Sequence, residues 1–172
     1  KSYNAFSSID FPCLAMIQDG NIMRYIPPVP YEEEVQFYEE LDENVYLIKM
    51  IPGIKPRILR SVFENYDCII VESFGVGGIP QSIADDFYKL CQEFPNRLVV
   101  MSTQVAHEGS DMTVYEVGQK VKQDFDLIES YDMTLEATIT KLMWLMSLPN
   151  MSYHDIKREF YQMVNHDILF TR

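Results

Sequence analysis

The feature that most constrains the fold is a regular alternation of short apolar runs with amphipathic segments in the middle of the chain. The apolar runs predict three strands, at residues 45–51, 68–72 and 98–101. The amphipathic segments between them predict two helices, at residues 56–65 and 81–94. The run at 68–72 is apolar almost throughout, which is typical of a strand covered on both faces. This order predicts an α/β fold: a small Rossmann-like parallel sheet of about four strands, flanked by helices.

Two more helices are predicted in the tail. Apolar residues recur at helical spacing over 135–147, and Thr134 is a suitable N-cap for that helix. A second helix is expected to begin near Tyr153, capped by Ser152. The methionines and Trp144 of the first tail helix are interpreted as core residues rather than as part of a cofactor-binding site.

Residues 1–44 follow a different pattern and are expected to form an appendage. Asp19-Gly20 lies between the apolar runs 13–18 and 21–26, which favours a tight hairpin. Prolines then stiffen the chain. The acidic stretch 32–42 is interpreted as a charged linker rather than as one face of a helix.

Charge and cysteine usage argue against several function classes. The formal net charge of −12 disfavours nucleic acid and anionic membranes as partners, because phosphate binding needs clustered Lys and Arg. The three cysteines are widely spaced and form no CxxC pair, so neither a metal site nor a cofactor is indicated. A reducing compartment is expected. No apolar run approaches the length of a membrane span.

A glycine-rich loop follows the second predicted strand. Gly75, Gly77 and Gly78 resemble part of the G-x-G-x-x-G dinucleotide motif, but Pro80 occupies the third glycine position and Gln81 follows it. A tight turn that brings backbone amides close to a small polar ligand is therefore favoured over a nucleotide site.

The polar loop at 102–118 follows the third predicted strand. Ser102, Thr103, His107 and Asp111 supply hydroxyl, imidazole and carboxylate groups within this one loop. Loop neighbours seldom converge in the geometry of a catalytic triad, so side-chain-to-backbone turns are the favoured interpretation.

Glu72 ends the most apolar strand, at the edge where both loops are expected to lie. Loops that leave the carboxyl ends of parallel strands form the usual ligand crevice of such folds. The Glu72 carboxylate could bind a ligand's amino group or accept hydrogen bonds from loop amides, and its position alone leaves both alternatives open. The residues thus predict a parallel α/β domain with a small-ligand edge and no catalytic group of its own.

Several short motifs occur in a fixed order between about residues 4 and 147. They are N-A-F-S-S at 4–8 with Phe11-Pro12, I-P-G-I at 51–54, G-V-G-G-I-P at 75–80, T-Q at 103–104, and D-M-T-L-E-A at 132–137 with Lys141-Leu142. This ordered set resembles the C-terminal domain of bacterial type I (cytoplasmic) L-asparaginases. The archaeal glutamyl-tRNA amidotransferase has a D subunit that shares the architecture and remains an alternative.

The resemblance implies a two-domain amidohydrolase that converts L-asparagine to L-aspartate and ammonia. In that family the N-terminal domain carries the threonine motifs T-G-G-T and T-D-T, and neither occurs in this sequence. Residues 1–44 are therefore expected to be the exit hairpin and linker from a missing catalytic domain, and residues 45–172 the C-terminal domain. No catalytic residue is expected in this chain, which should be inactive alone.

The resemblance also implies where the substrate would be met. It assigns a substrate-side loop, acting across a dimer interface, to Gly77, Gly78 and Tyr115. Gly78 stands where the family has Asn, so backbone amides are expected to replace that side chain. L-asparagine, assembly as a homodimer or tetramer, and a cytoplasmic location follow from the same resemblance, with no nucleic acid, membrane, metal or cofactor.

Some members of the family have an allosteric asparagine site on this domain. The corresponding positions here are Glu72, Thr103, Gln104 and Val105. Glu72 takes the place of an Arg and Val105 that of a Cys, which should weaken binding of an α-carboxylate. Regulation is therefore expected to be absent or altered. A non-catalytic binding or interaction module of the same fold remains the alternative function.

Overall fold

A four-stranded parallel sheet forms the centre of the protein, in a computed structural model that describes residues 7–9, 11–30, 32, 34–75, 77–114, 121–122 and 124–169. The strands follow chain order: β3 (Val45–Lys49), β4 (Cys68–Ser73), β5 (Leu98–Thr103) and β6 (Ile128–Glu129). The predicted α/β fold with about four strands is confirmed. β6 was not located from the sequence because two residues are too few to show a pattern.

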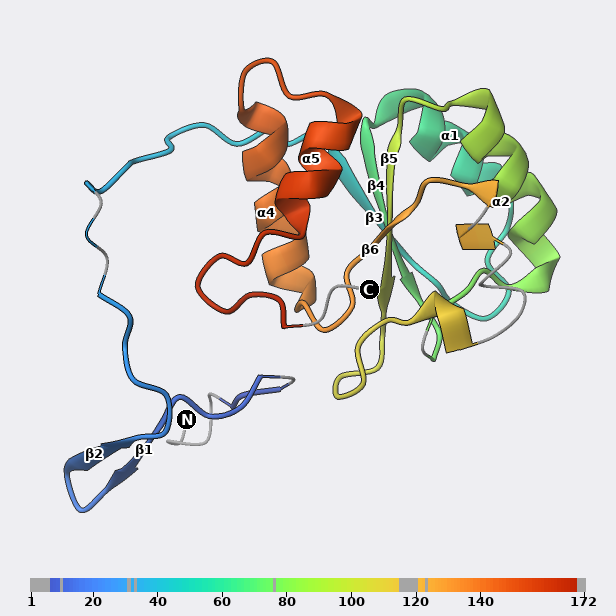
Figure 1. Cartoon of the computed structure of the whole chain (residues 1–172). Coiled ribbons are helices and arrows are strands. Elements are labelled where there is room, and N and C mark those ends of the chain that lie inside the picture. The colour runs from blue at the N-terminus through green and yellow to red at the C-terminus, as the bar shows by residue number, and fades with distance from the viewer. Residues whose placement is uncertain are drawn as a thin grey trace.

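Helices cover both faces of this sheet (Figure 1). One face carries α1 (Arg57–Asn65) and α2 (Gln81–Glu93), and the other carries α4 (Leu135–Ser147) and α5 (Tyr153–Phe160). A short 3-10 turn, η2 (Met112–Val114), follows β5. The predicted helix boundaries are correct to within one residue at each end that was specified. None of the helices in the described ranges is long and apolar enough to cross a membrane.

The central strand β4 is buried at all six of its residues. Side chains alternate across the sheet, so Ile69 and Val71 pack towards α1 and α2, whereas Cys68 and Ile70 pack towards α4 and α5. This two-sided burial is why the strand is apolar without alternation. Cys68 is fully buried, which confirms its interpretation as a small core residue.

Local capping fixes where the tail helices begin. Thr134 Oγ1 accepts a hydrogen bond of 3.3 Å from the backbone N–H of Ala137 at the start of α4. Ser152 and Asp155 form a reciprocal capping box at the start of α5. Hydrogen bonds from Ser152 hold the pKa of Asp155 below its ordinary value. Both predicted N-caps are confirmed.

The N-terminal appendage contains the expected hairpin. β1 (Ala15–Gln18) pairs antiparallel with β2 (Asn21–Arg24), and the two turn residues Asp19 and Gly20 have φ angles of 50° and 78°. Positive φ at both turn positions matches the twist of the hairpin strands. The acidic stretch forms no helix over residues 32 and 34–42, so the helix-face alternative is excluded at these residues.

The linker reaches the domain along α4. The backbone N–H of Asp42 donates a 2.9 Å hydrogen bond to Met143 O, and Ser147 Oγ donates to Glu40 O at 2.9 Å. The ring of Tyr38 packs edge-on against Trp144, with 5.2 Å between ring centroids. Trp144 is half-buried against the cluster on this face of the sheet, which agrees with its interpretation as a packing residue.

Phe63 and Phe37 allow a matched test of the core. Phe63 is fully buried and its ring lies 5.8 Å from that of Phe87, whereas Phe37 in the linker is 83% exposed. We expect Phe63→Ala to lower the free energy of unfolding by about 3–5 kcal/mol, through lost burial and a cavity. Phe37→Ala should change the free energy of unfolding by no more than about 0.5 kcal/mol. Urea denaturation followed by circular dichroism measures both, and equal effects would contradict this core assignment.

Candidate functional site

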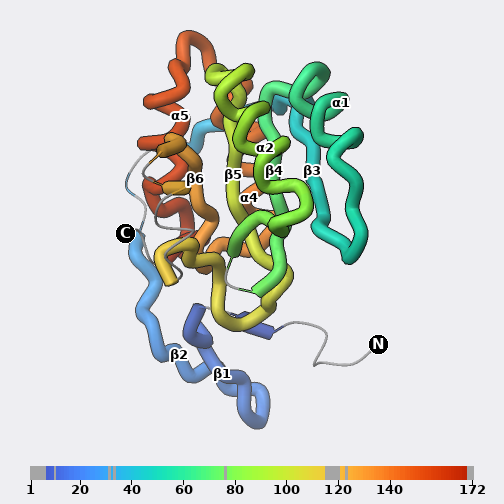
Figure 2. The backbone as a smooth tube through the Cα atoms, turned by 90° about the vertical axis from the view of Figure 1, so that its right-hand side faces the viewer, coloured from blue at the N-terminus to red at the C-terminus, as the bar shows by residue number. Residues whose placement is uncertain are grey.

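Two loops lie at the edge of the sheet where β4 and β5 end (Figure 2). The first, called here the glycine loop, joins β4 to α2 and is described at residues 74–75 and 77–80. The second, called here the β5 loop, comprises residues 104–114 and is yellow in Figure 2. A hydrogen bond from the Thr103 hydroxyl to Gly75 O joins the two. The predicted placement of both loops at one edge is confirmed.

The glycine loop is a tight turn that needs its glycines. Gly75, Gly77 and Gly78 have φ angles of 55°, 129° and 129°, which L side chains rarely adopt. The Gly77 N–H donates to Phe74 O at 3.3 Å. Pro80, in the third glycine position of the dinucleotide motif, is the N-cap of α2, which begins at Gln81. The turn interpretation is therefore confirmed at these positions.

Gly77 and Gly78 differ in what lies beside them. A Cβ atom on Gly77 would lie 3.2 Å from Met112 Cγ, so this turn rests directly on η2. No heavy atom lies within 4 Å of the corresponding position on Gly78. Met112 is only 2% exposed. The glycine loop is thus supported on one side by the β5 loop and open on the other.

The polar side chains of the β5 loop form local turns. The Val105 N–H donates to Thr103 Oγ1 at 3.0 Å, and the Thr113 N–H donates to Asp111 Oδ1 at 3.0 Å. His107 is exposed. The Thr103 hydroxyl proton points to a backbone carbonyl rather than to a base. These contacts confirm the interpretation as side-chain-to-backbone turns.

A cavity of about 220 Å³, called here the rim pocket, opens between the β5 loop and the start of α4. It contains all four positions that the resemblance assigned to an allosteric pocket. Its lining comprises Ile9, Glu72, Ser102, Thr103, Gln104, Val105, Ala106, Gly109, Tyr131, Met133, Thr134, Leu135 and Glu136. Gly77 and Gly78 do not line it, and Tyr115 lies outside the described residues.

Glu72 has a partner that neither sequence-based alternative included. Its buried carboxylate forms a 2.7 Å ion pair with Lys49 Nζ, one strand away on β3. Gln104 Nε2 donates to the backbone oxygens of Met50 and Glu72, at 2.7 and 3.1 Å. The Glu72 charge is therefore compensated within the protein, and the amide of Gln104 ties β3 and β4 to the rim pocket.

The buried cysteines are poor nucleophiles. Burial raises the pKa of Cys68 to about 12, with the nearby carboxylates of Asp42 and Asp67 adding to the effect. Burial also raises the pKa of Cys91 to about 12. Both thiols are protonated near neutral pH and unsuited to attack or metal binding. Within the described ranges, no cluster of His, Cys, Asp or Glu is suited to hold a metal ion.

The sequence over residues 44–160 matches the glutaminase/asparaginase C-terminal domain family. The chain belongs to that family. The L-asparaginase of Thermococcus kodakarensis is 39% identical over 144 residues, which cover 83% of this chain and 43% of that protein. The solved structure of the thermostable L-asparaginase from the same organism superposes with a TM-score of 0.86 at 33% identity, covering 99% of this chain and 52% of that one. The resemblance inferred from the motifs is confirmed.

Other relatives of this asparaginase C-terminal domain are of two kinds, L-asparaginases and amidotransferase D subunits. L-asparaginase 1 of Escherichia coli is 31% identical over 151 residues, which cover 84% of this chain and 43% of that protein. The D subunit of the glutamyl-tRNA(Gln) amidotransferase of Methanosphaera stadtmanae is 32% identical over 146 residues, covering 82% and 33%. The chain thus spans about half or less of the length of the relatives it matches.

Two charged residues of the asparaginase C-terminal domain's rim were missed by the sequence analysis. The carboxylate of Glu129, at the end of β6, is 2% exposed and pairs with Lys122 Nζ at 2.8 Å. Neither residue belongs to a motif. The only signal was an acidic residue directly after the apolar pair Leu127-Ile128, a pattern that many solvent-exposed carboxylates share.

Alanine substitutions at Gly77 and Gly78 should separate backbone strain from contact with η2. Both variants place a side chain at φ 129°, so each should lose about 1–3 kcal/mol of stability. Gly77→Ala should lose about 1–3 kcal/mol more, because its methyl group meets Met112. The free energies of unfolding in urea give the difference. Equal losses would show that Met112 does not support the turn.

Proposed function

We propose that this chain is the substrate-side half of an L-asparaginase, which hydrolyses L-asparagine to L-aspartate and ammonia through a threonyl acyl-enzyme. The supporting observation is its membership of the glutaminase/asparaginase C-terminal domain family, with 39% identity to a protein named L-asparaginase. The sequence contains neither T-G-G-T nor T-D-T. The attacking threonines therefore come from the other half of the enzyme.

The role of this half is to shape the rim against which the substrate is held. The glycine loop suits that role because Gly77 and Gly78 have no side chains, so a ligand can approach their backbone closely. The space beside Gly78 is open. Gly77 and Gly78 would approach the substrate through their backbone. Tyr115 completes the proposed substrate-side loop.

The proposed division of the chain is an exit segment at 1–44 and a C-terminal domain at 45–172. The family match begins at residue 44, next to this boundary. The hairpin leaves Ile17 73% exposed and Ile22 60% exposed, which favours a covering surface that is supplied by the catalytic half. A homodimer or tetramer would complete each site from two subunits. The free cysteines favour a reducing, cytoplasmic compartment.

A second candidate function is that of the D subunit of a glutamyl-tRNA amidotransferase, which would hydrolyse glutamine for a partner protein. The 32% identity to such a protein over 82% of the chain favours keeping it. The two candidates differ in what they need. An asparaginase releases ammonia from L-asparagine unaided, whereas the amidotransferase component needs L-glutamine, a partner and charged tRNA.

Ammonia release tests the main proposal. The 172-residue chain should release no ammonia from L-asparagine above buffer, because the acyl transfer needs threonines that it lacks. The longer protein encoded by the natural reading frame should carry T-G-G-T and T-D-T upstream of Lys1 and should release ammonia. Activity of the 172-residue chain would contradict the division of labour. An upstream sequence without the two motifs would favour a non-catalytic binding module.

The rim pocket should not bind asparagine tightly. Of its positions Glu72, Thr103, Gln104 and Val105, Glu72 adds a carboxylate to the lining, and this carboxylate is already paired with Lys49. A carboxylate in place of the family's Arg should disfavour the α-carboxylate of an amino acid. Calorimetry with L-asparagine should therefore detect no binding at micromolar concentrations. Heat that fits a micromolar dissociation constant would overturn the prediction that regulation is absent or altered.

A further inference from the structure

Glu129 is a buried carboxylate that the proposed site does not use. It ends β6, and its strand partner across the sheet is Met101 of β5. Its side chain is only 2% exposed. Burying a charge is costly unless the charge is paired and hydrogen-bonded, so the surroundings of Glu129 are informative.

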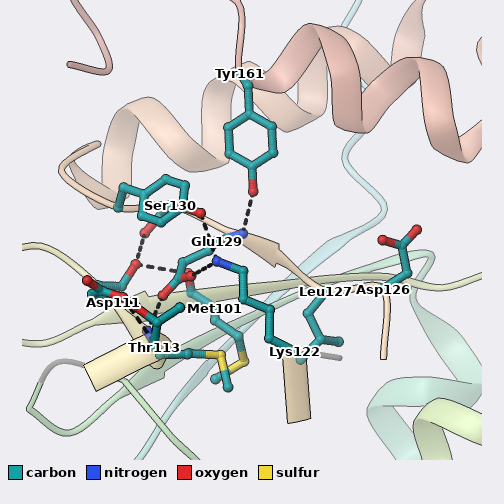
Figure 3. Close-up of polar contacts among 12 residues, drawn as sticks. Met101, Asp111, Thr113, Lys122, Asp126, Leu127, Glu129, Ser130 and Tyr161 are labelled. Carbon is teal, nitrogen blue, oxygen red and sulfur yellow. Dashed lines mark hydrogen bonds and ion pairs between the residues drawn. The ribbon is translucent and has the colours of Figure 1, made fainter. Parts of the chain in front are cut away.

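Both oxygens of the Glu129 carboxylate have partners. Oε1 accepts the backbone N–H of Met112 at 2.5 Å, and Oε2 accepts Lys122 Nζ at 2.8 Å. Lys122 Nζ also contacts Tyr131 Oη at 2.8 Å. Figure 3 shows Lys122 extending to Glu129, with Tyr161 above. The backbone N–H of Glu129 donates to Tyr161 Oη at 2.9 Å, so the residue that follows α5 holds the backbone of Glu129 at the end of β6.

Lys122 is held in its charged form. Burial lowers its pKa, but hydrogen bonds to Glu129 and Tyr131 more than offset that effect, and the net pKa lies above the ordinary lysine value. Its side chain is 28% exposed. The pair is therefore a hydrogen-bonded ion pair at neutral pH, with its anionic end inside the protein.

Met112 links the Glu129 carboxylate to the glycine loop. It is the first residue of η2, and its side chain lies directly against the turn at Gly77. A continuous series of contacts thus runs from Lys122 through Glu129 and Met112 to Gly77. The flanking turn between Asp111 and Thr113 shapes η2 locally, but the Glu129 hydrogen bond ties η2 to the sheet.

Stability alone does not require an ion pair at this position. An apolar pair of the same volume often stabilises a protein as well as a buried ion pair does. An ion pair adds direction, because a carboxylate fixes the position of the N–H that it accepts. We infer that Glu129, charged and paired with Lys122, is a positioning residue that sets the glycine loop against the substrate. The inference rests on the proposed function, in which this loop faces the substrate.

Amide hydrogen exchange in the 172-residue chain tests the positioning directly. Glu129→Gln keeps the shape of the side chain and removes its charge, so the amides of Met112 and Gly77 should exchange faster by about tenfold or more. The amide of Ile70, in the centre of β4, should exchange as in the unaltered chain. Unchanged exchange at Met112 and Gly77, or an equal rise at Ile70, would overturn the inference in favour of a general structural role.

Two further variants support this comparison. Lys122→Met removes the other partner and should raise exchange at the same two amides, which keeps the test decisive if Glu129→Gln does not fold. Glu93→Gln is the matched control, since it breaks an ion pair with Arg60 of similar length, 2.7 Å, on the exposed surface of α1 and α2. It should change exchange at none of the three amides.

Kinetics of the longer, ammonia-releasing protein test the consequence for the substrate. Glu129→Gln should raise KM for L-asparagine about tenfold and leave kcat within about twofold, because the bond-breaking groups lie on the other half of the enzyme. Glu93→Gln should change neither constant. A fall in kcat with KM unchanged would overturn the positioning role. An inactive unaltered longer protein would instead refute the proposed function, and the exchange experiment would still decide the role of Glu129.

Discussion

Burial of β4 on both faces is the constraint on which the rest of the structure depends. Its six residues are all buried, with α1 and α2 on one side and α4 and α5 on the other. A parallel strand in that position needs neighbours on both edges and crossover connections long enough to return along the sheet. Here the connections are made by α1 and α2. The loops that lead out of β4 and β5 therefore begin at the carboxyl ends of these strands. The gathering of both loops at one edge is therefore a consequence of covering one apolar strand.

The two loops at that edge support each other rather than act separately. Gly77 rests on Met112, and the Thr103 hydroxyl bonds to the carbonyl of Gly75. The polar side chains of Thr103 and Asp111, which could be taken for catalytic groups in the sequence, instead hold the backbone of these loops through hydrogen bonds. The described residues of these two loops can present amides and a defined surface to a ligand, but none of them is an activated nucleophile. This agrees with the proposal that the attacking groups belong to another part of the enzyme.

Two buried carboxylates lie close to these loops, and each forms an ion pair with a lysine. Glu72 pairs with Lys49 beside the rim pocket, and Glu129 pairs with Lys122 beside η2. In each case the carboxylate is enclosed and the lysine reaches it from a more exposed position. The two pairs act on different neighbours: the first compensates a charge that faces a cavity, whereas the second fixes a backbone amide. Position relative to the loops, more than the pairing itself, distinguishes their roles.

The sequence by itself determined the fold class, the four long helices, three of the four parallel strands, the hairpin turn and both tail N-caps. These features are set by local rules, namely apolar periodicity, side-chain capping and the tolerance of glycine for positive φ. It also placed the two loops at one edge, because strand direction decides that. Only the tertiary structure decided that Glu72 pairs with Lys49, that Gly77 needs room for Met112, and that Glu129 is an anchor rather than a surface charge. Those contacts join residues 17 to 35 positions apart, and no local pattern records which distant groups the packing of helices on a sheet brings together.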